Sequence, residues 1–415
     1  MTTAGALRST VIVSVRQSGE HVDPDEVQET RQLAEGIGLE VLETRAFAEH
    51  AVQRFLLGKG QIQDLRDLLS ALRADMVLFD TDLTALQYRY LADALGVPVM
   101  DRTRLILETF AAQAQTAEAR KRVQIAERMF ELTQLRAMNA GYDQQAGYIG
   151  MRGPGETLFQ ERRRARRSEI HELKEQVGKI DTRYAVKARA RQLAAVPKIA
   201  VVGYTNAGKS TLINVLANAH LAAEDRPFAT LDTAVRPVRL GRQSAVLIDT
   251  VGFIRNLPAS LMDSFRSTLE ETRSADLLLH VVDAGVRDLR ERIAVVEDVL
   301  ASIGCSDIPE VIVFNKMDTL PSSRRGELLS METGFPVSAV TGEGLQQLRD
   351  AIADTLLHQV RHGKYVIPFA YPEARAEVYS SAVVLSERTG PHSWIIEAAA
   401  SGPGAQLPPK FLRRG

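Results

Sequence analysis

The segment over residues 198–211 constrains the fold of this chain more than any other. An apolar run, residues 198–202, leads directly into the pattern G-x-x-x-x-G-K-S, and a helix-compatible segment over 212–219 follows. In this strand–loop–helix context the pattern predicts a P-loop, whose successive backbone N–H groups point at phosphate oxygens. A plain glycine-rich turn is the alternative, and the context disfavours it. The predicted contacts to a nucleoside triphosphate are Gly203, Tyr204, Thr205, Asn206, Ala207, Gly208, Lys209, Ser210 and Thr211.

Polar residues of this loop and of a second motif have the chemistry that a triphosphate needs. We expect Lys209 to supply a positive charge to the β- and γ-phosphates and the Ser210 hydroxyl to bind Mg²⁺. A second apolar run, residues 245–248, ends in a D-x-x-G motif that begins at Asp249. We expect Asp249 to hold the Mg²⁺ shell and the Gly252 N–H to sense the γ-phosphate. D-x-x-G alone is a weak signal.

Two further motifs indicate which base is bound. The apolar run 311–314 leads into N-K-x-D, namely Asn315, Lys316, Met317 and Asp318. An Asp at the end of this motif can accept hydrogen bonds from guanine N1–H and N2–H₂, a donor pair that adenine lacks. A third tripeptide at the end of an apolar run begins with Ser338 and Ala339, whose backbone can cover the guanine O6. Four motifs in this order predict that the ligand is GTP.

The segment between the P-loop and D-x-x-G is a candidate switch loop. It contains Phe228, Thr230 and Thr233. A switch needs a Thr that can reach Mg²⁺ and the γ-phosphate and release them after hydrolysis. We expect Thr230 to have this role, with Thr233 as the second choice, and we include Phe228 among the nucleotide contacts. An ordinary Ser/Thr turn is the alternative. The predicted catalytic residues are Lys209, Thr230 and Gly252, and the predicted metal ligands are Ser210 and Thr230.

The order of elements predicts an α/β protein whose P-loop GTPase domain has a doubly wound parallel sheet. Short apolar runs alternate with helical patterns, and each motif follows such a run, where open α/β sheets bind ligands. The predicted parts are a small N-terminal α/β domain (8–112), a two-helix arm with an Arg-Gly-Pro-Gly loop and a basic block (113–195), the G domain (197–360), a small α+β module (361–400) and a disordered tail (401–415).

With these motifs in view, the chain resembles the HflX family of translation-factor-class GTPases. The G domain carries the matching stretches GYTNAGKS, FATLD, DTVGFIRNLP and NKMD. Upstream, residues 57–61, 101–103 and 151–157 match stretches of the family's N-terminal region. The resemblance spans roughly residues 10 to 360. It departs at residues 158–159, where the family usually has a more polar pair, and at Thr233, which replaces a common Pro after the switch Asp.

This resemblance implies a ribosome-associated GTPase that binds the large subunit and splits stalled or idle ribosomes. The residues 162–167 form a dense basic block that suits contacts to rRNA phosphates. Glutamates nearby, among them Glu169 and Glu172, allow i,i+4 pairs, so a solvated helix face is an equal alternative on charge alone. Our hypothesis is that the Arg-Gly-Pro-Gly loop, with Arg152, enters a cavity walled by RNA.

Two residues bear on the rate of hydrolysis. Ras-like enzymes use a Gln directly after D-x-x-G to orient the attacking water. Here the residue is Phe253, so we expect slow intrinsic hydrolysis, stimulated by the ribosome. Asn206 stands where potassium-activated GTPases use an Asn to ligate the ion, so K⁺ is a candidate cofactor beside Mg²⁺. That Asn206 only tightens the loop is equally acceptable.

Two other functions remain open from the residues alone. One is a nucleotide-gated switch in ribosome assembly without meaningful catalysis, because Phe253 already weakens intrinsic chemistry. The other is an RNA-remodelling ATPase that uses a second site in the N-terminal domain. Residues 58–60, Gly-Lys-Gly, could hold a phosphate there, although a loop turn is the better interpretation.

Composition excludes several classes of protein. The net charge of −1 over 415 residues excludes a globally basic RNA binder. A single cysteine, Cys305, excludes an internal disulfide framework and suits a reducing cytosol. No apolar run approaches eighteen residues, and no leader pattern is present. We therefore expect a cytoplasmic monomer whose partners are GTP or GDP and the large ribosomal subunit, with rRNA contacts through the arm and the basic block and no membrane span.

Overall fold

The structure is a computed structural model, in which the described residues fall into two units. Described are residues 8–16, 23–48, 56–114, 116–145, 160–178, 196–218, 234–241, 243–250, 252–255, 272–331, 333–359, 361–381, 383–400 and 411–413. The first unit contains those up to Gly178, and the second contains those from residue 196 onward.

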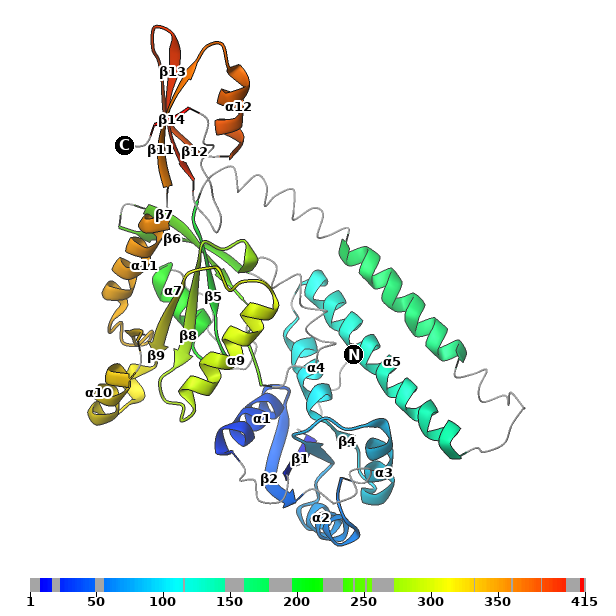
Figure 1. Ribbon diagram of the computed structural model, residues 1–415. Helices are drawn as coiled ribbons and strands as arrows, with labels where there is room; N and C mark the ends of the chain where they lie inside the picture. Colours follow the sequence, from blue (N-terminus) through cyan, green and yellow to red (C-terminus); the bar gives the residue numbers. More distant parts are fainter. Residues whose placement is uncertain are drawn as a thin grey trace. The chain divides into compact units, whose positions relative to one another are not determined.

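The N-terminal domain is built on a four-stranded parallel sheet in the order β2-β1-β3-β4 (Figure 1). Its elements in chain order are β1 (Arg8–Arg16), α1 (Pro24–Gly36), β2 (Leu39–Ala48), α2 (Lys59–Leu72), β3 (Met76–Phe79), α3 (Ala85–Leu95), β4 (Val99–Met100) and α4 (Arg102–Gln113). All four residues of β3 are buried. Such a central strand reads as a continuous apolar run because helices cover both faces of a parallel sheet.

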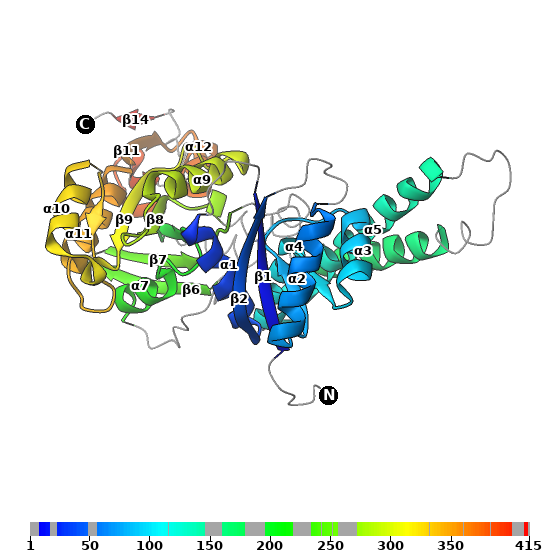
Figure 2. The same cartoon turned by 90° about the horizontal axis from the view of Figure 1, so that it is seen from below.

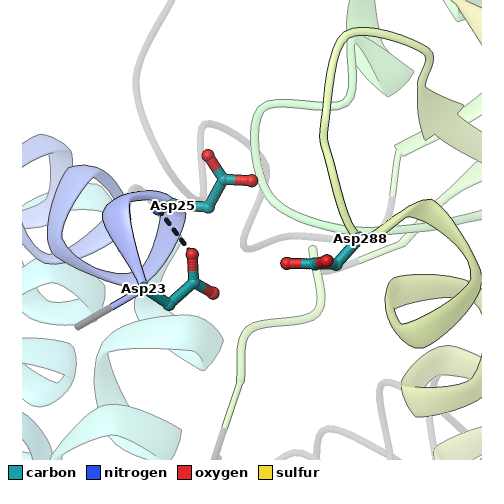
Figure 3. A group of neighbouring side chains, drawn as sticks. All are labelled: Asp23, Asp25 and Asp288. Atoms are coloured by element: carbon teal, nitrogen blue, oxygen red, sulfur yellow. Dashed lines mark hydrogen bonds between the residues drawn. The ribbon is translucent and has the colours of Figure 1, made fainter. Parts of the chain in front are cut away.

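The helices of this domain begin at clear capping residues. The carboxylate of Asp23 accepts a hydrogen bond from the Asp25 N–H (2.9 Å), with Pro24 in the first turn of α1 (Figure 3). The third side chain labelled there, Asp288, belongs to the second unit, where it is the N-cap residue of helix α9 (Leu289–Ser302). α2 begins at Lys59, inside the Gly-Lys-Gly motif, and Gly58 donates to the Gln61 side chain (2.7 Å).

Arginines at the carboxyl edge of this sheet join α1 to the strands. Arg102 donates to Thr30 (2.9 Å) and forms a buried ion pair with Glu29. Arg16, the last residue of β1, contacts Glu26 (2.6 Å) and Asp80 (3.1 Å). Within the described part of the domain, these two arginines at the sheet edge are therefore engaged by acidic side chains of the same domain.

The arm consists of α5 (Ala117–Gln145) and a second helix over residues 160–178, which run side by side in both views (Figures 1 and 2). Ion pairs connect the two helices. Arg128 contacts Glu169 (3.1 Å), and Arg166 contacts Glu131 (2.8 Å). The predicted Arg-Gly-Pro-Gly loop lies outside the described residues.

The G domain contains a six-stranded sheet in the order β10-β9-β8-β5-β7-β6. Its elements are β5 (Lys198–Val202), α7 (Lys209–Leu216), β6 (Ala234–Leu240), β7 (Gln243–Asp249), β8 (Leu277–Asp283), α9 (Leu289–Ser302), β9 (Glu310–Asn315), the 3₁₀ turn η1 (Met317–Thr319), α10 (Ser322–Met331), β10 (Phe335–Pro336) and α11 (Leu345–Gln359). All neighbouring strands are parallel except β6 and β7, which form an antiparallel pair at one edge.

Alternate residues of these strands form a hydrophobic core on each face of the sheet. Ile199 and Val281 pack in one cluster with residues of α7 and α11. Val282 and Phe314 pack in another with residues of α9 and α10. This two-sided cover confirms the predicted doubly wound α/β fold. The antiparallel edge strand is the one departure from the predicted parallel sheet.

A small α+β module follows the G domain, as predicted. Its antiparallel sheet has the order β12-β13-β11-β14. The elements are β11 (Arg361–Pro368), α12 (Pro372–Ser381), β12 (Val383–Thr389), β13 (Ser393–Ala400) and β14 (Leu412–Arg413). The sequence suggested a disordered tail after residue 400, but Leu412 and Arg413 pair with β11. A hydrophobic anchor, Phe411, accounts for this, because it packs against the core of the module.

None of the described helices combines the length and the apolar character that crossing a bilayer requires.

A buried carboxylate in the N-terminal domain allows a test of the fold. Asp101 caps α4, accepting from the Arg104 N–H (2.8 Å), and burial raises its pKa from 3.8 to about 6. Between these values the folded domain keeps a proton that the unfolded chain has lost, so stability falls as pH rises. Asp101→Asn keeps the cap and removes the buried charge. We expect it to stabilise the domain on the order of 2 kcal/mol at pH 7.5 and little at pH 4, measured by hydrogen exchange.

The control is a variant at a carboxylate whose pKa is shifted in the opposite direction, so the expected change in stability has the opposite sign. The Ser9 N–H (2.8 Å) and hydroxyl lower the pKa of Asp75. Its carboxylate therefore contributes stability above the ordinary pKa, and that contribution is lost as pH falls. Asp75→Asn should destabilise the domain at pH 7.5. Equal shifts in the two variants would contradict this account of Asp101.

Candidate nucleotide site

The loop between β5 and α7 has the backbone of a P-loop, and two of its glycines are required by close approach. Gly203 has φ 142°, and a Cβ there would lie 2.1 Å from the Val281 carbonyl oxygen. Gly208 has φ 88°, and a Cβ there would lie 2.2 Å from Nδ2 of Asn315. Only glycine fits both positions. Neighbouring strands and loops therefore fix the curl of the loop.

The Lys209 ammonium lies inside the loop. Its Nζ donates to the carbonyl oxygens of Gly203 (3.0 Å) and Tyr204 (2.7 Å), and the residue is only 7% exposed. Burial lowers its pKa from 10.5 to about 8, and the Asp249 carboxylate acts in the opposite direction. The lysine thus presents a positive charge with its position already set by the backbone.

Ser210 and Asp249, two residues assigned to Mg²⁺ from the sequence, lie within hydrogen-bonding distance of each other. The Ser210 hydroxyl, in the first turn of α7, donates to the Asp249 carboxylate (3.1 Å) at the end of β7. The register of β5 and β7 pairs Val201 with Asp249, which brings the two motifs to the same edge. A hydroxyl and a carboxylate are hard oxygen donors of the kind that Mg²⁺ prefers, so this pair fits the expected ion. Phe228, Thr230 and Thr233 lie outside the described residues.

The D-x-x-G segment is paired with the P-loop backbone. The Phe253 N–H donates to the Gly203 oxygen (3.0 Å), and the Thr205 N–H donates to the Phe253 oxygen (2.8 Å). A Cβ on Gly252 would lie 2.9 Å from Nζ of Lys209. Phe253 is only 5% exposed, so the residue after the motif serves packing. No local pattern in the sequence indicates this pairing.

On the base side, Asn315 joins three loops. Its Nδ2 donates to the Ala207 oxygen (2.9 Å), and its Oδ1 accepts from the Ala339 N–H (3.0 Å). The Ser338 hydroxyl donates to the Asp318 carboxylate (2.6 Å), which is otherwise exposed. The structure therefore brings the predicted base-binding residues together beside the P-loop.

Several P-loop side chains take positions that the sequence left open. Asn206 has φ 61°, a left-handed conformation that Asn tolerates better than most residues. Tyr204 is buried, and the guanidinium of Arg292 lies 5.1 Å from the centre of its ring. Thr205 is half-buried, Ala207 is buried, and Thr211 lies half-buried in the first turn of α7.

Three charged residues of the site were missed by sequence reasoning. Asp283 forms an ion pair with Lys316 (2.9 Å). It ends an apolar strand, the same signal that identified Asp249, and could have been found by it. Arg255, two residues after Phe253, contacts Glu291 of α9 (3.3 Å). Arg349 of α11 donates to the backbone carbonyl oxygens of Val215 and Leu216 (3.0 and 2.8 Å). The arginine thereby caps the C-terminus of the P-loop helix. The last two had no signal in the sequence.

Family models and curated proteins match the sequence of this chain. Three family models match: 50S ribosome-binding GTPase over residues 198–316, GTP-binding GTPase N-terminal over 24–111, and GTP-binding GTPase Middle Region over 113–191. The GTPase HflX of Escherichia coli K12 is 35% identical over 371 residues, covering 88% of this chain and 87% of that protein. The GTPase HflX of Caldanaerobacter subterraneus subsp. tengcongensis is 36% identical over 376 residues, covering 89% and 85%.

Among solved structures, a GTP-binding protein from Sulfolobus solfataricus in complex with GDP matches with a TM-score of 0.44 and 22% identity. The match covers 84% of this chain and 98% of that chain.

Replacing Asn315 tests whether the three loops act as one site. Asn315→Ala removes a donor and an acceptor and leaves the Ala207 oxygen and the Ala339 N–H without their partner. Each lost bond costs about 1–3 kcal/mol, so we expect GDP to bind about a hundredfold more weakly, or worse. Titration calorimetry measures this directly. Gln346→Ala, which removes an exposed amide on α11, is the control. Equal affinities for the two variants would show that the three loops do not depend on Asn315.

Proposed function

Because the chain belongs to the HflX family of GTPases, we propose that it binds the large ribosomal subunit and separates the subunits of idle or stalled ribosomes. The chain is a GTP-binding protein of a GTPase family. The proposal extends this to the large ribosomal subunit as partner, to stimulation of GTP hydrolysis by that subunit, and to the roles of single residues. The observation that carries the proposal is the joining of a guanine nucleotide site to a separate helical arm with exposed arginines.

We infer the roles of the site residues from their positions. The Lys209 ammonium, which is held inside the loop, pairs with the negative charge of the β- and γ-phosphates. The backbone N–H groups of the loop bind phosphate oxygens. P-loop GTPases generally use Mg²⁺, which Ser210 and Asp249 would hold together with Thr230, and which neutralises charge on the phosphates when bound. The Gly252 N–H senses the γ-phosphate. Asp318 accepts from the guanine edge, beside Ser338.

Slow intrinsic hydrolysis follows from Phe253. An apolar, buried side chain cannot polarise water, and its backbone is engaged by the P-loop. The attacking water is therefore positioned by a group that the bound partner supplies or orders. A potassium ion held beside Asn206 would add positive charge near the transferred phosphoryl group.

The arm supports an RNA partner because three of the five arginines of the basic block are exposed, whereas Arg163 and Arg166 are half-buried. Arg166 is engaged by Glu131 and Glu169 and serves to join the two helices. Arg162, Arg164 and Arg167 are exposed, and none of them forms an ion pair with another residue in the described part of the chain. Exposed guanidinium groups on one helix suit contacts to the phosphate backbone of rRNA.

The main test is GTP hydrolysis by the purified protein, alone and with large ribosomal subunits, in potassium buffer. We expect slow turnover alone and at least a tenfold increase with subunits, because the partner completes the catalytic site; tenfold corresponds to about 1.4 kcal/mol of barrier. Lys209→Ala should abolish the stimulated rate. Release of small subunits from whole ribosomes, followed by sedimentation, then tests splitting.

The same assay separates the alternatives. No stimulation, with GTP still bound, would contradict the proposal and favour a nucleotide-gated switch acting on another partner. Equal stimulated rates in sodium and potassium buffers would exclude the role of potassium. ATP turnover that survives Lys209→Ala would favour a second site in the N-terminal domain.

A charge variant of the arm tests RNA contact. Arg162, Arg164 and Arg167 are replaced together by Gln, which keeps helix propensity and removes three charges. Each lost phosphate contact lowers the slope of log affinity against log salt by about 0.7–0.9, so we expect the slope for subunit binding to fall by about 2. The control replaces Arg45, Arg66 and Arg89, three exposed arginines of the N-terminal domain. An unchanged slope would contradict RNA contact through this helix.

A further inference from the structure

Asp283 lies outside all four nucleotide motifs, yet the topology brings it against one of them. It is the last residue of β8, and the register of β8 and β9 pairs it with Asn315. The next residue, Ala284, donates its N–H to the Asn315 oxygen (2.9 Å). Asp283 therefore lies beside the N-K-x-D motif, next to the position that Lys316 occupies.

Both carboxylate oxygens of Asp283 are engaged. Oδ2 lies 2.9 Å from Nζ of Lys316, and Oδ1 accepts from the Gly285 N–H (2.8 Å). The hydrogen bond from the Gly285 N–H, two residues further along the chain, fixes the orientation of the carboxylate. The side chains are 24% and 29% exposed, so this ion pair is partly removed from water and stronger than a typical surface pair.

Lys316 needs such an anchor. Its backbone has φ 63° and ψ 33°, a left-handed conformation that costs a residue with a Cβ about 1–2 kcal/mol. Its four-carbon stem is among the most flexible side chains, and fixing it on ligand binding costs entropy. Its neighbours in the motif have other roles, since Asn315 joins the loops and Asp318 faces the base. An ammonium held at its far end leaves the stem ordered before a nucleotide arrives.

We propose that Asp283 is a positioning residue for guanine nucleotide binding, which acts by holding the side chain of Lys316 between Asn315 and Asp318. The proposal rests on the nucleotide site of the proposed function and needs no ribosomal partner. Asp283 contacts neither base nor phosphate in this account. Its contribution is preorganisation, so it should affect affinity for the nucleotide more than the rate of hydrolysis.

Asp283→Asn separates this role from a structural one. The amide oxygen can still accept from Gly285, so the turn after β8 is kept, while the charge that pairs with Lys316 is lost. We expect GDP affinity by calorimetry to fall about two- to tenfold, the cost of ordering one long side chain. Inosine diphosphate, which lacks the 2-amino group, should lose affinity by the same factor, because Asp318 is untouched. Asp298→Asn, an exposed carboxylate on α9, is the matched control.

A double-mutant cycle with Lys316→Met completes the test. Methionine keeps an unbranched stem without the ammonium, so Asp283→Asn should add no further loss in that background. An equal loss in both backgrounds would overturn the proposal, because Asp283 would then act through the fold. Wild-type affinity in the Asp283→Asn single variant would overturn it as well. Wild-type protein that bound no GDP would overturn the nucleotide site itself, and the proposal with it.

Discussion

The two hydrogen bonds of the Asn315 side chain connect the loops of the candidate nucleotide site. One amide gives a donor to the P-loop at Ala207 and an acceptor to the loop at Ala339, while its own backbone belongs to β9. No carboxylate or hydroxyl of similar size offers both a donor and an acceptor in this fixed geometry. Its contact with the P-loop leaves no room for a Cβ at Gly208. The P-loop and the loop that contains Ala339 are thereby connected through one side chain.

Sequence patterns predicted the parts of this fold that local chemistry encodes. The P-loop, D-x-x-G and N-K-x-D each follow an apolar strand, and parallel strands bring their carboxyl ends to one edge. The pairing of Phe253 with the P-loop and the antiparallel edge strand β6 depend on long-range backbone contacts, which leave no pattern in the residues. The boundaries of the predicted parts and the roles of the site residues stay predictions.

The basic block shows why charge patterns alone are ambiguous. From the sequence, its arginines could equally pair with glutamates of their own helix or contact RNA. In the structure Arg166 pairs with Glu169 at i+3 and also with Glu131, which lies on the other helix of the arm. That second partner is distant in sequence and could not be identified from spacing. The tertiary contact therefore decides which arginines face solvent.

The hydrogen bonds of Arg349 to the end of the P-loop helix connect segments that are far apart in the sequence. α11 holds the last carbonyls of α7 through this guanidinium, and β11 of the C-terminal module begins almost immediately after α11 ends. One arginine therefore connects the helix that leads into the C-terminal module with the helix whose first residue is Lys209.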